Sequence, residues 1–155
     1  MLVVKLDHQA KRSWLNSIAG GVRSETAPIL DECGQKLTEL AAVYFTRLSR
    51  GGTGYSGRHW AKPRPSTVRR RKALAARGLL RAPVELQGVL TGELQASLGY
   101  EVGGTRLKLR YAAEHARWFN IHRRLIPSRL PTEWRTACDA IVTRRLISLV
   151  TKTPQ

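Results

Sequence analysis

Apolar side chains recur every three or four residues over two long stretches of the chain. The first stretch covers residues 25–49 and is followed closely by Gly51 and Gly52, and the second runs from Thr132 to about Val150. This spacing places apolar side chains along one face of an α-helix. The sequence therefore predicts two long amphipathic helices, one near each end of the chain.

A separate short helix is predicted ahead of the first long one. Residues 7–19 have a helical composition and are followed by Gly20 and Gly21, and a glycine pair commonly ends a helix. Ser24 is then placed to cap the long helix, with Pro28 in its first turn. We therefore expect a break in the helix at the glycine pair.

Alternation of apolar and polar side chains indicates β structure over residues 97–111. Apolar residues occupy every second position on either side of Gly103 and Gly104, which is typical of a β-hairpin with a glycine turn. A further short strand or turn is predicted near residues 84–90. Together these elements predict an α+β fold, in which long N-terminal and C-terminal amphipathic helices pack on a small antiparallel sheet. The other face of the hairpin carries Arg106, Lys108 and Arg110.

A basic segment separates the first long helix from the hairpin. Residues 51–81 contain nine Lys or Arg and no Asp or Glu. Glycines and prolines make residues 50–65 a loop, and a short helix is predicted over residues 66–77. Because its apolar stripe is thin, this helix is expected to lie on a surface or to become ordered only against a neighbour.

Composition indicates a folded and strongly positive protein. The 155 residues carry a formal net charge of +16 at pH 7, and 42% of them are hydrophobic, which is enough for a core. We interpret the chain as a single domain, residues 1–155, with an N-terminal segment 1–23 and the extended basic arm at 51–81. A field this positive attracts polyanions, so the sequence favours a partner rich in phosphate or carboxylate groups.

Neither a signal peptide nor a run of about 20 apolar residues that would span a membrane is visible. A cytosolic product without a membrane partner is therefore expected. Cys33 and Cys138 fall on the apolar faces of the predicted helices. This placement favours two buried thiols in a reducing compartment, while a disulfide between them stays open.

Residues that could carry catalysis are few and scattered. His115 and His122 lack a metal-binding pattern around them, and neither cysteine has a second cysteine close by in sequence. No phosphate-binding glycine loop, nucleophile elbow or carboxylate pair is visible. We interpret the chain as a non-enzyme with no catalytic residues, no metal and no cofactor. Motifs for sequence-specific readout of nucleic acid are missing as well, which leaves non-specific contact with phosphates.

Several short motifs follow one another in order along residues 25–150. The basic helix comes after Trp60, and the later motifs are VLTGELQASL at 89–98, RYAAEHA at 110–116 and IPSR at 126–129. In this order the chain resembles the virion morphogenesis proteins of tailed bacteriophages, the Mu-type tail-completion and neck family. The residues that carry the resemblance, besides Trp60, are Leu90, Thr91, Gly92, Leu94, Ser97, Tyr111, His115, Pro127 and Arg129.

The resemblance implies a structural virion protein at the neck or tail top, which joins the DNA-filled head to the tail. Such a subunit would form a ring with other copies of itself, and a hexamer is favoured over a dodecamer. Its neighbours would be other neck, connector or tail-terminator proteins. It would be located in the virion, and in the host cytoplasm during assembly.

On this interpretation, the basic arm lines the DNA channel of the ring or reaches a neighbouring subunit. Trp60 is expected to anchor the arm in a neighbour's pocket, as aromatic residues do at interfaces, and residues 51–65 are expected to be ordered mainly by that neighbour. The alternative function is a free-standing protein that binds nucleic acid without sequence specificity. The candidate contact residues are Arg58, Trp60, Lys62, Arg64, Arg69, Arg70, Arg71 and Lys72.

Overall fold

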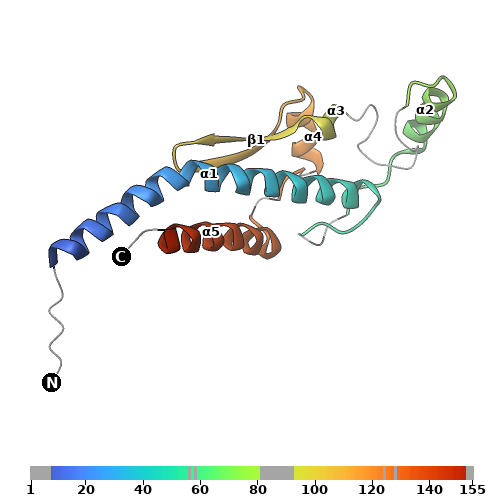
Figure 1. Ribbon diagram of the computed structural model, residues 1–155. Helices are drawn as coiled ribbons and strands as arrows, with labels where there is room; N and C mark the ends of the chain where they lie inside the picture. The colour runs from blue at the N-terminus through green and yellow to red at the C-terminus, as the bar shows by residue number, and fades with distance from the viewer. Residues whose placement is uncertain are drawn as a thin grey trace.

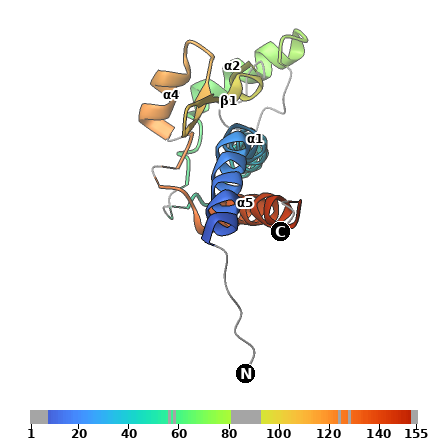
Figure 2. The ribbon, with the colours of Figure 1, turned by 60° about the vertical axis from the view of Figure 1, so that its left-hand side comes forward.

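One long helix contacts both the β-hairpin and the second long helix. The computed structural model describes residues 8–55, 57, 59–80, 93–123, 125–127 and 129–152. Helix α5 (Thr132–Lys152) packs antiparallel against part of helix α1 (His8–Ser49), from Leu149 beside Gly21 to Trp134 beside Tyr44. The strands β1 (Leu98–Gly103) and β2 (Arg106–Tyr111) lie on the opposite side of α1 from α5 (Figures 1 and 2). The predicted α+β class, with two long helices and an antiparallel hairpin, is confirmed.

The predicted break between two N-terminal helices is wrong, because α1 continues through Gly20, Gly21 and Pro28. Ser24 does not cap a new helix; its hydroxyl donates to the backbone carbonyl of Gly21 at 2.8 Å, within the helix. Gly21 lies directly against Leu149 of α5, and a Cβ at this position would overlap the leucine side chain. Gly21 therefore permits close packing of α5 on α1, which offsets the cost of about 1 kcal/mol for glycine inside a helix.

The hairpin is formed as its alternation predicts. Leu98 pairs with Tyr111 and Gly103 with Arg106 in antiparallel register. Gly104 adopts a positive φ of 57° in the two-residue turn, a conformation that glycine reaches without steric cost. The hairpin rests on α1, where Tyr100 covers Gly34 so closely that a Cβ there would overlap the ring.

The hydrophobic core lies where the C-terminal half of α1, the start of α5 and the hairpin meet. Phe45, Leu48 and Trp134 are almost completely buried there. The short helices α3 (Glu93–Ala96) and α4 (Ala116–Arg123) close the core at the end of the hairpin that lies away from its turn. The residues of the core cluster are Leu37, Ala41, Tyr44, Phe45, Leu48, Trp60, Leu94, Ala116, Leu125 and Trp134.

The predicted basic helix is α2 (Pro65–Ala76). Proline suits the first position of a helix, because the missing N–H has no partner there in any case, and Gly78 follows the helix with a positive φ of 68°. Figure 1 shows α2 standing away from the body, and it makes no extensive contact with any other described helix or strand. The strand or turn predicted near residues 84–90 lies outside the described residues. Among the helices the structure describes, none combines the length and the apolar character needed to cross a membrane.

Candidate polyanion-binding arm

The exposed cations of the protein concentrate on the segment from Ala61 to Arg77, which we call the basic arm. It contains the loop that leads away from Trp60, followed by helix α2. Six of its seven Lys and Arg side chains are exposed to solvent, and no Asp or Glu occurs anywhere in residues 51–81. The exposed cations are Lys62, Arg64, Arg69, Arg70, Lys72 and Arg77.

Consecutive cations on α2 point in different directions, because successive residues of a helix are about 100° apart. Arg69, Arg70 and Lys72 are exposed, but Arg71 is only 5% exposed. Arg71 was a candidate for contact with a partner, and its burial removes it from that surface. The correction follows from the helix itself, since four consecutive cations cannot all face solvent once one side of the helix is covered.

The exposed cations of the arm have no carboxylate partner within the described part of the chain. The ion pairs found there lie on α1, between α1 and α5, or within the hairpin. By contrast, Arg110 on the outer face of the hairpin is paired with Glu101 at 2.7 Å. The arm therefore presents a positive charge that an external anion can neutralise without displacing a carboxylate of the described residues.

Trp60 does not point outward as an anchor for a neighbouring subunit. It is 6% exposed and belongs to the protein's own core. Its ring packs edge-on against Phe45 of α1 at a centroid distance of 5.5 Å and against Phe119 of α4 at 5.6 Å. The interface role predicted for Trp60 is therefore corrected: a large apolar side chain next to its own core is buried there during folding.

The indole also ties the start of the arm to α4. Trp60 Nε1–H donates to the backbone carbonyl of Arg123 at 2.6 Å, and Arg123 Nη1 donates back to the carbonyl of Ala61 at 3.2 Å. The Arg123 guanidinium also lies 5.7 Å from the centre of the Trp60 ring. Its pKa is lowered by burial, although an arginine stays charged at any ordinary pH. The two reciprocal hydrogen bonds fix the point from which the basic arm leaves the body.

A second aromatic cluster holds the loop that precedes Trp60. Tyr55 stacks on Tyr44 with 5.0 Å between ring centres, and its hydroxyl donates to Glu133 at 2.9 Å. Trp134 Nε1–H donates to the same hydroxyl at 3.0 Å, and Arg47 lies over the Tyr55 ring at 4.9 Å. Burial raises the pKa of Tyr55, and the hydrogen bond to Glu133 adds to the rise.

These contacts belong to one chain, so the expectation that a neighbour orders residues 51–65 is corrected at Tyr55, His59 and Trp60. The loop is held at Tyr55 by the cluster with Trp134 and at Trp60 by the core. Between these points, His59 contacts the carbonyl oxygen of Gly51 at 3.0 Å and the hydroxyl of Thr53 at 3.3 Å. Arg58 lies outside the described residues.

Some of the residues in the short sequence motifs help to build the core and the end of the hairpin. Leu94 is buried in the core, and the Ser97 hydroxyl donates to its carbonyl at 2.8 Å. The Ser97 carbonyl in turn accepts from the N–H of Ala112 at 2.9 Å, next to the end of β2. Tyr111 packs against the same core, and burial raises the pKa of its hydroxyl to about 12.

The other motif residues do not gather into a site. His115 and Arg129 are exposed, and Pro127 is half-buried. Leu90, Thr91 and Gly92 lie outside the described residues. Within the described ranges, no three His, Cys, Asp or Glu side chains lie close enough together to hold a metal ion.

Sequence reasoning missed Arg123 and the Tyr55 cluster. Arg123 is one of many arginines, and nothing in the sequence distinguishes it from the others. Comparison with models of known protein families, with curated proteins and with solved structures finds no match for this chain.

Proposed function

We propose that this chain is a structural virion protein of a tailed bacteriophage, which assembles with copies of itself into a ring at the neck or tail top. A hexamer is the favoured ring and a dodecamer the alternative. The ring joins the head to the tail, beside other neck, connector or tail-terminator proteins. The motif order along the sequence supports this assignment, and the basic arm supplies its physical basis.

The observation that carries the proposal is the contrast between the fixed base of the arm and its free surface. Trp60 and Arg123 hold the base in the core, whereas Arg69, Arg70 and Lys72 of α2 are exposed and have no carboxylate partner in the described chain. An arm built in this way brings positive charge to a polyanion while the body remains free for contacts with other subunits. The polyanion is packaged DNA passing through the ring, or an acidic surface of an adjacent neck protein.

Contact with DNA would be independent of base sequence. A helix that reads a groove needs an apolar back that docks on its own domain, and α2 has only Val68 and Leu74 half-buried in addition to Arg71. Its cations face several directions and suit phosphate oxygens better than base edges. Affinity should therefore depend steeply on salt and hardly on sequence.

Binding to a short duplex, followed by fluorescence anisotropy between about 0.05 and 0.3 M salt, tests the role of the arm. The triple variant R69Q/R70Q/K72Q removes three exposed cations from α2. If all three contact phosphates, the slope of log K against log salt should become shallower by about 2.7 units, since each phosphate contact contributes about 0.9. We expect affinity at about 0.1 M salt to fall by roughly 10- to 100-fold.

A matched control separates a local site from overall charge. The variant R12Q/R23Q/R135Q lowers the net charge equally at exposed positions on α1 and α5. We expect this control to keep most of the wild-type slope. Equal losses in the two triple variants would show that only the overall charge matters, and the arm would not be a binding site.

A free-standing protein that binds nucleic acid non-specifically is the second candidate. It is favoured by the same exposed arm, together with the exposed Arg106 and Lys108 of the hairpin. Light scattering in about 0.5 M salt distinguishes the two functions, because contacts between apolar surfaces survive salt and phosphate contacts do not. A ring keeps the mass of several chains under these conditions. A single-chain mass combined with undiminished DNA binding at low salt would favour the second candidate.

A further inference from the structure

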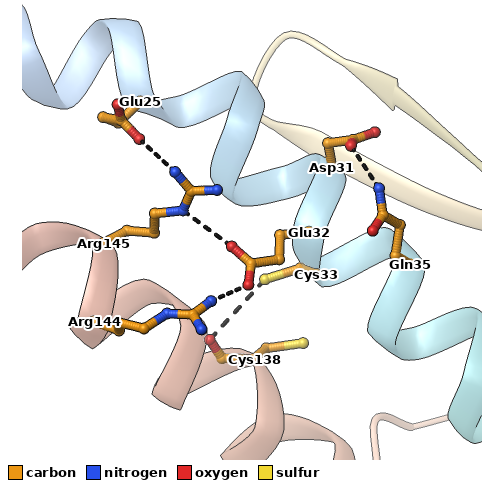
Figure 3. A network of polar contacts seen from close by, with 8 residues as sticks. All are labelled: Glu25, Asp31, Glu32, Cys33, Gln35, Cys138, Arg144 and Arg145. Atoms are coloured by element: carbon orange, nitrogen blue, oxygen red, sulfur yellow. Dashed lines mark hydrogen bonds and ion pairs between the residues drawn. The ribbon is translucent and has the colours of Figure 1, made fainter.

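The two cysteines of the protein face each other across the α1–α5 helix pair. Cys33 and Cys138 are the only cysteines in the sequence, and both are free thiols. Cys33 Sγ points at the backbone carbonyl of Cys138 at 4.0 Å (Figure 3). The Cys33 thiol is close enough to add to the rise in the pKa of the Cys138 thiol. Residues 105 positions apart in sequence are thus brought together by the packing of two helices.

Ion pairs beside the thiols fix how the two helices are rotated. Glu32, next to Cys33, accepts hydrogen bonds from both Arg144 and Arg145 of α5, the latter at 3.0 Å (Figure 3). Arg145 also lies 3.6 Å from Glu25, two turns earlier on α1. Because the Glu32 carboxylate of α1 accepts from two successive arginines of α5, these ion pairs oppose rotation or sliding of one helix along the other. The ion pairs therefore help to keep Cys33 next to Cys138.

We propose that Cys33 and Cys138 form a covalent modification site, which an oxidising low-molecular-weight disulfide converts into an intramolecular disulfide that locks α5 onto α1. The helices already bring the Cys33 sulfur to within 4.0 Å of the Cys138 backbone carbonyl oxygen. A disulfide requires the sulfurs to approach to about 2.05 Å, with about 3.5–4.5 Å between the β-carbons. The proposal requires that rotation of the two side chains about χ1 supplies this approach.

The reaction proceeds by two exchanges of sulfur partners. Cys138, the more accessible thiol, attacks the small disulfide as a thiolate and forms a mixed disulfide, releasing one small thiolate. Cys33 then loses its proton to solvent and attacks Cys138 Sγ, which forms the protein disulfide and expels the second small thiolate. The two protein thiols are oxidised, one small disulfide is reduced to two thiols, and the protons pass to the released thiolates.

The environment of the two thiols makes formation of the disulfide slow, and the long loop that it closes makes it favourable. Burial raises the pKa of the Cys138 thiol to about 11, and the neighbouring Cys33 and Asp139 add to the rise. Little thiolate is therefore present at neutral pH, so closure takes hours rather than seconds. Once formed, the cross-link closes a loop of more than 100 residues in the unfolded chain, which restricts the unfolded state strongly. This inference rests on the helix pair and not on the proposed function.

The test uses the full-length protein incubated with oxidised glutathione. We expect both thiols to disappear from a thiol titration in denaturant, and the intact mass to fall by two hydrogens with no glutathione attached. The melting temperature should rise by about 5–15 °C, and a reducing agent should reverse all three changes. In Cys33→Ser, the reaction should stop at a glutathione adduct on Cys138 without a rise in melting temperature.

Three results would overturn the inference. Both thiols could remain titratable after oxidation, glutathione could remain attached to the wild-type protein, or the cross-link could join two chains on a non-reducing gel. Because the readouts are mass and melting temperature, they are independent of DNA binding and ring formation. Failure here would leave the proposed function untouched, and failure of the proposed function would leave this site untouched.

Discussion

Replacing Trp60 with alanine should destabilise the folded protein severely, because the indole belongs to the core. Its side chain is 6% exposed and packs edge-on against Phe45 and Phe119. Truncating a buried tryptophan costs about 3–5 kcal/mol in lost packing and an unfilled cavity. Loss of the Nε1–H donor leaves the Arg123 carbonyl without that partner and adds about 1 kcal/mol. We expect Trp60→Ala to lower the free energy of unfolding by about 4–6 kcal/mol, a large share of the total of about 5–15 kcal/mol for a domain.

A more conservative replacement separates packing from the hydrogen bond. Trp60→Phe keeps an aromatic ring between α1 and α4 but removes the donor to Arg123, so it should cost about 1–2 kcal/mol. Urea unfolding followed by circular dichroism at the helical band measures both losses. The control is Val43→Ala, whose side chain is 66% exposed and which should change stability by less than about 0.5 kcal/mol. A Trp60→Ala protein within about 1 kcal/mol of wild type that failed only in assembly would place the indole in a neighbour's pocket and refute this reasoning.

Two further perturbations probe the packing around the hairpin. Burial raises the Tyr111 pKa from 10.0 to about 12, so the folded state holds this proton where the unfolded state has lost it, and stability should fall as pH rises from about 10 to 12. The Tyr111 share of that fall is about 2 kcal/mol, and Tyr111→Phe should remove it; identical alkaline curves for the two proteins would contradict the burial. Gly34→Ala should cost about 1–3 kcal/mol, since its Cβ meets the Tyr100 ring. Gly20→Ala, which meets nothing within 4 Å, should instead stabilise α1 by about 0.5–1 kcal/mol in thermal melts; the opposite order would show that the hairpin does not sit on α1.

The regular elements of this fold could be predicted from the sequence because each follows from a local pattern. Alternation over residues 97–111 predicts the hairpin, and the apolar spacing after Thr132 predicts α5. Gly20 and Gly21 misled the prediction, because α1 continues through both, and the role of Gly21 depends on Leu149, which is distant in sequence. The local sequence of the glycine pair predicts a helix end. In the fold the helix continues, and Gly21 lets α5 pack closely on α1.

The candidate site was predictable in composition but not in orientation. The count of cations in residues 51–81 locates the arm, and the structure leaves six of the cations between Ala61 and Arg77 exposed. Which of them turns inward depends on how α2 is seated, so the burial of Arg71 has no local signal. The burial of Trp60 likewise has no local signal, because its partners Phe45 and Phe119 come from two other elements. Trp60 therefore lies in a basic segment of the sequence but packs against aromatic rings in the fold.

The measurement that tests the central proposal most directly is head–tail joining in a phage that encodes this chain. The gene is disrupted and the protein is supplied in trans as wild type, as R69Q/R70Q/K72Q, or as the charge-matched control R12Q/R23Q/R135Q, and particles are counted by electron microscopy. The account predicts that disruption leaves filled heads and tails unjoined. Wild type and the control should restore complete particles, and the arm variant should restore about tenfold fewer, in line with its weaker polyanion contact. Complete infectious particles at normal yield without the protein, or with the arm variant as the only copy, would contradict the account.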